Sequence, residues 1–275
     1  MAHPPPAAAT KDFPYWLVAA VAIAVAAALF IAASDLYRQI FSAISRGIWI
    51  TVWVTLLGFA LASLIGLGMA LMALSRSLVL RQISRFYVEI IRGVPVLVLL
   101  FWIAFAGVPA FVAAWNWLAT PLREAGLVDE LLVRDISLLW RAIIALTIGY
   151  SAFIAEVFRA GILSVDPGQI EAAKALGLSG FQRFRLIVFP QAIRTILPPL
   201  GNDFVAIVKD SSLVSVLGVA DITQMGKVYA SGSFRFFETY SIVAYIYLIL
   251  TVGLSMMLRA LEQRMRKAQT GEGRR

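Results

Sequence analysis

The chain has 275 residues, of which 60% are hydrophobic and 15% are charged, and its mean hydropathy is +0.83. A soluble domain of this size cannot bury so much apolar surface, so the composition excludes a soluble protein and predicts an all-α polytopic membrane protein. The sequence contains no cysteine, which excludes disulfides, thiolate metal sites and cysteine nucleophiles. The net charge of +8 is better explained by Lys- and Arg-rich cytoplasmic loops than by binding to nucleic acid.

Six segments are apolar over roughly the 20 residues that a helix needs to cross a bilayer. These predicted spans are Tyr15–Ala33, Gly47–Leu74, Phe86–Gly107, Leu138–Phe158, Ala192–Ala220 and Tyr240–Leu258. The first segment could instead be a signal peptide, because Lys11 precedes it and Ala32-Ala33-Ser34 weakly resembles a cleavage site. Its apolar run is longer than the core of a signal peptide, so a retained helix is favoured.

The distribution of Lys and Arg predicts the orientation of these spans. With the N-terminus in the cytoplasm, the inner segments hold 15 Lys and Arg residues and the outer segments hold 6. Both termini and the loop around Glu171 are therefore predicted to be cytoplasmic. The two longer outer segments are Val108–Ser137 and Asp221–Thr239. The first of them carries an acidic cluster that is either a docking face for an external protein or a solvated loop.

The largest cytoplasmic loop is predicted to begin with a short, well-capped helix. Asp166 is expected to cap it, Pro167 to take the first helical position, and Gln169 to reach back as in a capping box. Gly177 fits the left-handed position that ends such a helix. The first helix of the loop is therefore predicted to stop at a defined turn.

A second short helix is predicted to follow this turn. Ser179 and Gln182 have the spacing of another capping box. Pro190 is predicted to open the next segment, where its missing N–H costs little. Most loops between membrane helices lack such construction, so the loop is expected to dock a soluble partner; the alternative is that it only covers the ends of the spans.

The composition of the first loop helix also favours docking. The small side chains of Ala172 and Ala173 let another surface approach the backbone closely, and Glu171 offers a charge to an Arg or Lys. The spacing Glu171-Ala172-Ala173, three residues, Gly177, nine residues and Ile187-Val188-Phe189-Pro190 resembles the EAA loop of ABC importer permeases. In that family the loop forms the coupling helix that fits a cleft on the ATP-binding subunit.

Six further motifs resemble the polar amino acid branch of the same family. They are Arg92-Gly93-Val94-Pro95, Ala155-Glu156-x-x-Arg159-x-Gly161-Ile162, Gly168-Gln169, Pro190-Gln191-Ala192-x-Arg194, Leu197-Pro198-Pro199-Leu200-x-Asn202 and Lys209-Asp210-Ser211-Ser212-Leu213. Two residues depart from the family pattern, since Phe189 replaces the usual Leu and Val94 replaces the commoner Thr.

The resemblance covers about Gly47 to Glu262 and implies a type I ABC importer fold with five core transmembrane helices. It implies a permease domain over residues 47–262, with the coupling loop at 164–190. Residues 15–34 are then an extra N-terminal transmembrane helix. Residues 1–14 and 263–275 are predicted to be cytoplasmic tails.

Two charged residues, Lys209 and Asp210, lie inside the predicted span Ala192–Ala220. A charge near the bilayer centre costs about 3 kcal/mol or more, so such residues usually face a cavity or each other. Neighbouring helical residues point about 100° apart, so these two share a partner only if the helix is broken. Pro198-Pro199 and the serines after Asp210 predict an irregular helix that lines a cavity.

Lys209, Asp210, Ser211 and Ser212 form the candidate substrate site. A zwitterion needs a cation for its carboxylate, an anion for its ammonium and hydroxyls for orientation, and these four residues supply all three. The alternative is a structural ion pair between Lys209 and Asp210.

Two acid–base pairs at (i, i+3) spacing, Glu89 with Arg92 and Glu156 with Arg159, are interpreted as gate or scaffold residues. Pro95 removes a backbone donor, so the third predicted span is expected to kink or break. The second predicted span is assigned to helix packing, because small residues let membrane helices approach closely. Its small residues are Gly58, Ser63, Gly66, Gly68 and Ala70.

The sequence lacks the phosphate loop, the Gly-x-Ser-x-Gly motif and paired-His motifs, and its one histidine, His3, is expected to be solvated. The chain is therefore predicted not to be an enzyme and to hold no metal or cofactor; ATP and Mg²⁺ are expected on a partner.

The resemblance implies a permease that carries a polar amino acid across a bacterial inner membrane by alternating access. The implied partners are a pair of ATPase subunits, a second permease chain that is a copy or a homologue, an external amino-acid-binding protein and membrane lipid, without nucleic acid. One alternative keeps this machinery and carries an opine or another small polar solute. Another is a stand-alone secondary transporter with Lys209, Asp210 and Glu156 as ion-coupling groups, but inverted repeats are not found.

Overall fold

The computed structural model describes residues 15–270, and within that range the chain is helical with no strand. The α-helices are α1 (Tyr15–Ala33), α2 (Asp35–Ala73), α3 (Leu78–Gly93), α4 (Val96–Trp102), α5 (Val108–Leu118), α6 (Thr120–Glu124), α7 (Leu138–Leu163), α8 (Pro167–Ala175), α9 (Gly180–Arg183), α10 (Phe189–Asp210), α11 (Ile222–Ser233) and α12 (Phe236–Thr270). The π-helical turns are η1 (Ile103–Gly107) and η3 (Phe184–Val188), and the 3₁₀ turns are η2 (Val133–Asp135) and η4 (Ser211–Leu217).

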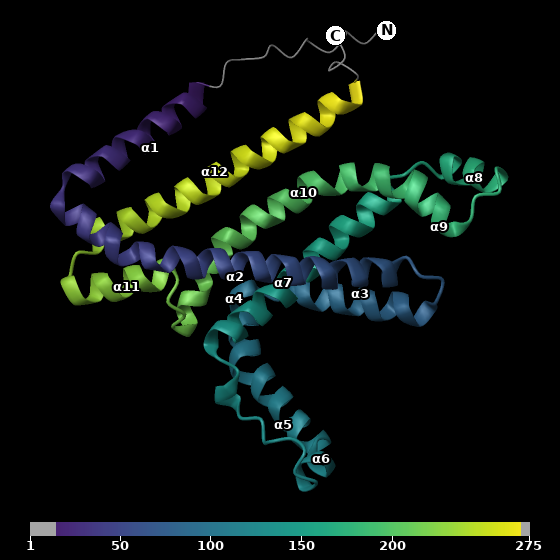
Figure 1. The fold of residues 1–275 in the computed structure, drawn as a ribbon, viewed down its shortest axis with the longest axis horizontal. Helices are drawn as coiled ribbons and strands as arrows, with labels where there is room; N and C mark the ends of the chain where they lie inside the picture. The colour runs from purple at the N-terminus through teal and green to yellow at the C-terminus, as the bar shows by residue number, and fades with distance from the viewer. Residues whose placement is uncertain (1–14, 271–275) are drawn as a thin grey trace.

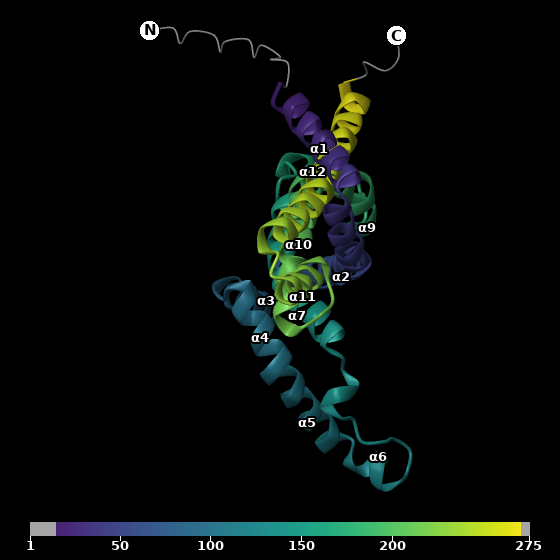
Figure 2. The ribbon, with the colours of Figure 1, turned by 90° about the vertical axis from the view of Figure 1, so that its left-hand side faces the viewer.

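The helices α2 and α7 form the centre of the molecule, with the most extensive contact of any pair. Helices α3 and α10 pack along α7, and α12 lies beside α1 and α10 (Figure 1). Helices α4, α5 and α6 form an arm that projects from this bundle in both views (Figures 1 and 2). The short helices α8 and α9 lie at the far end of α7 and α10 (Figure 1).

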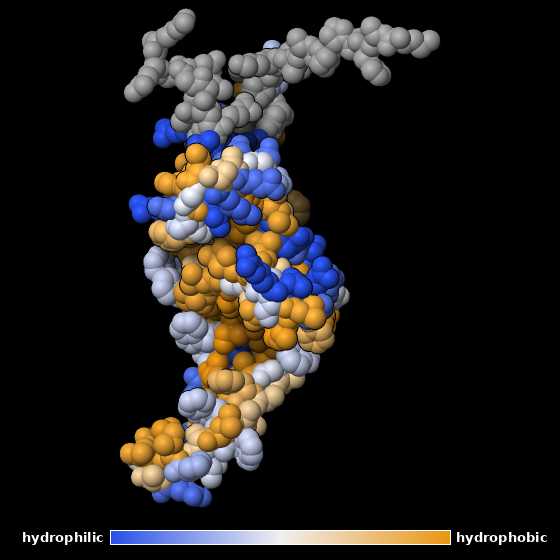
Figure 3. All heavy atoms as spheres, turned by 90° about the vertical axis from the view of Figure 1, so that its right-hand side faces the viewer, coloured by the Kyte–Doolittle hydropathy of each residue, from blue (hydrophilic) through white to orange (hydrophobic). Residues whose placement is uncertain are grey.

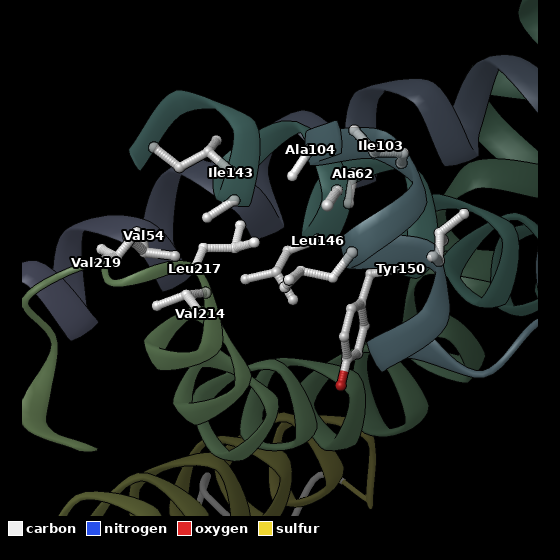
Figure 4. Packing of buried hydrophobic residues seen from close by; sticks show 14 of the residues in the cluster. Val54, Ala62, Ile103, Ala104, Ile143, Leu146, Tyr150, Val214, Leu217 and Val219 are labelled. Atoms are coloured by element: carbon white, nitrogen blue, oxygen red, sulfur yellow. The ribbon is translucent and has the colours of Figure 1, made fainter. Parts of the chain in front are cut away.

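The main core lies where α2, α4, α7 and η4 meet. Val54, Ala62, Ile143 and Leu146 are completely buried there (Figure 4). The predicted packing role of Gly66 agrees with this arrangement, since a Cβ at Gly66 would lie 2.9 Å from the carbonyl oxygen of Ser151 on α7. Small residues thus let α2 and α7 approach to backbone contact.

Gly68 does not pack on another helix of the described chain. Its neighbourhood holds nothing within 4 Å of an added Cβ, and the residue is exposed. Gly66 and Gly68 are two positions apart, which places them on different faces of a helix. Only the first faces α7.

Four described helices are long and apolar enough to cross a membrane. They are Asp35–Ala73, Val96–Leu118, Leu138–Leu163 and Phe236–Arg264. The predicted first segment, Tyr15–Ala33, is a helix with the predicted bounds, and its apolar part Val18–Ala33 is shorter than these four. The predicted spans Gly47–Leu74, Leu138–Phe158 and Tyr240–Leu258 correspond to longer helices, because their polar ends continue the same helical backbone.

The predicted span Phe86–Gly107 is wrong in its bounds, although the expected break is confirmed. Helix α3 ends at Gly93, and Val94 is extended with φ −102° and ψ 129°. Pro95 enforces this, because it lacks an N–H and disfavours a helical conformation in the residue before it. The apolar span is Val96–Leu118, so the first eleven residues of the predicted outer segment belong to it.

Each π-helical turn directly precedes a helix with proline in its first turn. The N–H of Val108 bonds the carbonyl of Ile103 before Pro109, and the N–H of Phe189 bonds the carbonyl of Phe184 before Pro190. The wider turn accommodates a residue that lacks an N–H. Pro190 lies in the first turn of α10, as predicted, although α9, η3 and α10 follow one another without a gap.

The expected irregularity of the charged helix is confirmed only after Asp210. Helix α10 runs through Pro198 and Pro199, and the α-helix changes to the 3₁₀ turn η4 at Ser211. Gly218, with φ +82°, then ends η4 in a left-handed conformation that suits a residue without a Cβ. The predicted segment Ala192–Ala220 is therefore a continuous helix through Asp210, followed by the 3₁₀ turn η4.

Candidate functional site

The start of α8 has the predicted cap with one difference. The Oδ1 of Asp166 accepts from the N–H of Gly168 at 2.7 Å, and Pro167 takes the first helical position. Gln169 does not reach back to the cap, so that part of the prediction is wrong. Its Oε1 accepts instead from Nε2 of Gln191 at 2.6 Å, which ties α8 to α10.

The end of α8 is fixed by Gly177, as predicted. Gly177 has φ +76°, and its N–H donates to the carbonyl of Lys174 at 2.9 Å. The N–H of Leu178 donates to the carbonyl of Ala173 at 3.1 Å. These two bonds make a Schellman motif, which satisfies the last carbonyls of the helix and needs a residue that tolerates positive φ.

The predicted second capping box is present at α9. The N–H of Ser179 donates to Oε1 of Gln182 at 2.8 Å, and the N–H of Gln182 donates to Oγ of Ser179 at 3.3 Å. Arg183 adds a bond from Nη1 to the carbonyl of Leu178 at 2.7 Å. The turn between α8 and α9 is therefore fixed by the Schellman motif at the end of α8 and by the capping box at the start of α9.

One face of α8 packs on the protein and the other is free. Ala173 is 3% exposed, and Ile170 packs on the cluster of Val165, Val188, Ala192 and Ile196. Glu171 and Ala172 are exposed. Glu171 and Ala172 of the motif thus lie on the exposed face of α8, while Ala173 is buried and Ile170 joins the loop to the cluster on α7 and α10.

Large apolar side chains also lie exposed on this loop, and sequence reasoning missed them. Leu176 is 80% exposed and Phe181 is 71% exposed, on either side of Gly177. Seen from the side of α8 and α9, hydrophilic side chains gather mainly in the upper half, over a mostly apolar surface (Figure 3). Apolar residues next to caps within a polar segment were the available signal, because a solvated loop has no need of them.

The candidate substrate residues lie at the junction of α10 and η4. Lys209 is exposed and forms no ion pair within the described part of the chain, so the alternative of a Lys209–Asp210 pair is wrong. Asp210 instead accepts on Oδ2 from the hydroxyl of Tyr150 at 2.8 Å. Ser211 is buried and donates to the carbonyl of Val208, and Ser212 accepts through its carbonyl from Ser215.

Sequence reasoning missed Tyr150 and Asp203 near this junction. Asp203 lies seven residues before Asp210, and its buried Oδ2 has no hydrogen-bond partner in the described structure. Residues i and i+7 share a helix face. A carboxylate in an apolar segment was the signal for Asp203, but the partner of Asp210 required the packing of α7 on α10.

The two predicted acid–base pairs differ in structure. Arg159 binds Glu156, with Nη2 to Oε2 at 2.6 Å and Nε to Oε1 at 3.1 Å, so this pair is present. Glu89 and Arg92 form no ion pair in the described residues; the Arg92 guanidinium lies 5.5 Å from the centre of the Phe153 ring. No cluster of three or more His, Cys, Asp or Glu suited to a metal occurs among the described residues.

Known proteins that are similar to this chain are transport permeases. Residues 62–267 match the family described as binding-protein-dependent transport system inner membrane component. The glutamine transport system permease protein GlnP of Escherichia coli (strain K12) is 36% identical over 221 residues, covering 80% of this chain and 92% of the relative. The octopine transport system permease protein OccM of Rhizobium radiobacter is 36% identical over 225 residues, covering 82% and 86%.

A solved structure described as an amino acid ABC transporter with histidines has a similar fold. It superposes with a TM-score of 0.68 at 35% identity and covers 81% of this chain and 94% of its own. The prediction of an all-α type I importer fold is thereby confirmed, as is the resemblance based on the EAA loop. The chain belongs to the family of binding-protein-dependent transport system inner membrane components, the membrane-spanning permeases of ABC importers.

Proposed function

We propose that this permease carries a polar amino acid and is driven by a separate ATPase that docks on the loop at 164–190. The observation that carries the proposal is the capped helix α8 with Leu176 and Phe181 exposed beside it. Exposed apolar side chains on a rigid, polar loop are typical of a protein–protein contact. Relatives named for glutamine and octopine transport support a small zwitterionic cargo.

The proposed orientation places both termini and α8 in the cytoplasm, where ATP is available. Because the sequence has no phosphate loop, ATP and Mg²⁺ bind to the partner subunits. Two permease chains form the pore, and an external binding protein delivers the cargo. Closure of the ATPase pair on ATP moves α8, and the pore alternates between inward-facing and outward-facing states.

The contacts of α8 give this movement a route into the membrane. Gln169 is bonded to Gln191 at the start of α10, and the cluster around Val188 and Ala192 joins the same two helices. Lys209 and Asp210 lie at the other end of α10. A rigid helix that connects the docking loop to the proposed cargo site is a physical basis for coupling between them.

The proposed cargo site comprises Lys209, Asp210, Ser211 and Ser212, with Tyr150 orienting the carboxylate of Asp210. A carboxylate and an exposed ammonium suit the two charges of an amino acid. The likeness to OccM supports one second candidate, an opine, which shares these charged groups. Competition between labelled L-glutamine and octopine for uptake separates the two cargoes.

Co-purification with the ATPase tests the proposal. The complex in lipid nanodiscs is expected to hydrolyse ATP faster when the cargo-loaded binding protein is added. Leu176→Gln and Phe181→Gln are expected to lose the ATPase subunit. Leu127→Gln is the control, because Leu127 is a similarly exposed leucine on the segment between α6 and η2, and this variant is expected to retain the subunit. Normal ATPase binding by both loop variants would overturn the docking role.

A further inference from the structure

A polar cavity of about 430 Å³ lies between α2, α3 and α7, away from the candidate cargo residues. Its charged lining residues are Arg85, Glu89 and Arg92 from α3 and Glu156 and Arg159 from α7. The volume is within the roughly 300–1,000 Å³ of pockets that bind small molecules. Leu163, the last residue of α7, also lines it, next to the start of the loop at 164–190.

Helix α3 is oriented so that its charged stripe faces this cavity. Ser84 donates to the carbonyl of Met69 on α2 at 2.8 Å, and the hydroxyls of Tyr87 and Ser151 on α7 are 2.6 Å apart. These bonds fix the rotation of α3. Arg85, Glu89 and Arg92 follow at i, i+4 and i+7 and therefore form one stripe.

A second face of α3 is apolar and exposed. It carries Val79, Ile83, Phe86 and Ile90. These apolar residues suit contact with lipid, whereas the charged stripe, whose residues are also exposed, lies on another face and needs water. The charged stripe therefore lines an aqueous cavity.

The charges in the cavity are only partly neutralised. Arg159 is bonded to Glu156, and Arg92 lies over the ring of Phe153. Arg85 and Glu89 form no ion pair in the described part of the chain. The cavity thus presents a carboxylate and guanidinium groups that remain available to a ligand with both an ammonium and an anionic group.

We propose that this cavity binds the ammonium and carboxylate groups of a free α-amino acid on the side of the membrane proposed to be cytoplasmic. Glu89 receives the ammonium, and Arg85 and Arg92 receive the carboxylate. The inference rests on the proposed function, because the ligand is the class of molecule that the permease delivers to this side. A bound amino acid contacts the end of α7 next to the docking loop and slows further transport.

The headgroup of phosphatidylethanolamine offers the same pair of charges, an ammonium and an anion. The free amino acid is favoured because Arg92, at the C-terminal end of α3, places its guanidinium over Phe153, in the middle of α7. A lipid headgroup lies at the membrane surface and would contact residues near the start of α3 instead. Vesicles with and without phosphatidylethanolamine distinguish the two sources.

The test uses proteoliposomes of the whole complex for which ATP-driven uptake has been established. L-glutamine loaded inside is expected to slow uptake, and N-acetyl-L-glutamine, which lacks the ammonium, is not. Glu89→Gln and Arg92→Gln are each expected to raise the half-inhibiting internal concentration about tenfold or more, since each removes a charge-assisted hydrogen bond. Arg76→Gln is the control, because it removes the same charge outside the cavity.

Equal inhibition in wild type and both cavity variants would overturn the inference while leaving the transport function intact. So would inhibition by internal L-glutamine that appears only in vesicles without phosphatidylethanolamine, because the lipid headgroup would then be the resident ligand. Equilibrium binding of L-glutamine to the same complexes, lost in Glu89→Gln and kept in Arg76→Gln, is the second readout. A complex without uptake would instead contradict the proposed function.

Discussion

Gln191 donates through Nε2 to Oε1 of Gln169 at 2.6 Å and to the carbonyl of Ile187 at 3.0 Å. The first bond joins two residues that are 22 positions apart, one in the first turn of α8 and one in the first turn of α10. The second holds the same amide on the π-helical turn. The loop at 164–190 and the long helix behind it are thus connected by a specific side-chain bond as well as by apolar packing.

Loss of this bond is expected to uncouple ATP hydrolysis from uptake. A typical internal hydrogen bond contributes about 1 kcal/mol, equivalent to about fivefold in an equilibrium, so Gln169→Ala or Gln191→Ala should lower uptake several-fold at unchanged ATP hydrolysis. The double variant should be no worse than either single variant, because both remove one interaction. Simultaneous measurement of uptake and phosphate release checks this, and strictly additive losses would contradict it.

The left-handed turn at Gly177 is expected to be essential for docking. A Cβ at φ +76° costs roughly 1–2 kcal/mol, so Gly177→Ala should distort the end of α8 and weaken ATPase binding. Gly180→Ala is the matched control, because an added Cβ there meets only the end of the Arg183 side chain at 3.8 Å. Binding of the ATPase to permease nanodiscs measures both. Equal affinity for the two variants would contradict a role for the turn.

The caps of the loop at 164–190 could be predicted from sequence because they depend on neighbouring residues. Asp166, Gly177 and the Ser179–Gln182 box all have the expected local geometry. The partner of Gln169 could not be predicted in the same way, because Gln191 reaches it only when α8 folds back on α10. Local caps are encoded in residue spacing, whereas the choice between two possible donors to Oε1 of Gln169 is made by tertiary packing.

The hydroxyl of Tyr150 is expected to set the cargo affinity through Asp210. Tyr150→Phe removes the only donor that the structure assigns to Oδ2 of Asp210 and should raise the KM for uptake about tenfold; Asp210→Asn should reduce uptake further. Tyr229→Phe, on α11, is the control for loss of a tyrosine hydroxyl. ATPase binding should be unchanged in all three. Unaltered KM in both site variants would exclude these residues from the cargo site.

The bounds of the membrane spans could not be predicted from apolar runs alone. Residues 86–107 are apolar enough to suggest one helix, but the geometry before Pro95 divides them between α3 and the span Val96–Leu118. Conversely, Pro198 and Pro199 suggested a break, and α10 continues through them. A proline interrupts a helix when the residue before it leaves the helical region, as Val94 does, and this depends on the packing on both sides.

Gly66 and Gly68 provide a test of the contact between α2 and α7. An added Cβ at Gly66 would lie 2.9 Å from the Ser151 carbonyl oxygen and 3.0 Å from the Ala155 nitrogen, so Gly66→Ala should destabilise the protein by about 1–3 kcal/mol. Gly68→Ala meets nothing within 4 Å and should be neutral or slightly stabilising, because alanine favours a helix. Thermal unfolding of both variants in the same nanodiscs measures the difference, and equal melting temperatures would contradict the packing.

Asp221 is expected to make stability depend on pH. This residue caps α11, where its carboxylate accepts from the N–H groups of Thr223 and Gln224 and from the hydroxyl of Tyr247. It is completely buried, and burial raises the pKa of its carboxyl above the ordinary value although these bonds oppose the shift. The folded state therefore holds the proton more readily than the unfolded state does.

The higher pKa of Asp221 in the folded state determines how stability changes with pH. The contribution of Asp221 to stability is greatest below the ordinary carboxyl pKa of about 3.9 and is lost as the pH rises through the higher folded-state pKa. Asp221→Asn keeps an oxygen acceptor for the cap but does not titrate, so wild type should lose stability relative to this variant as the pH rises from about 4 to 7. Asp221→Ala should be destabilised at every pH, because the cap itself is lost. Melting temperatures across this range check both, and a difference between wild type and Asp221→Asn that stays constant or runs in the opposite direction would show that the buried carboxyl does not control stability.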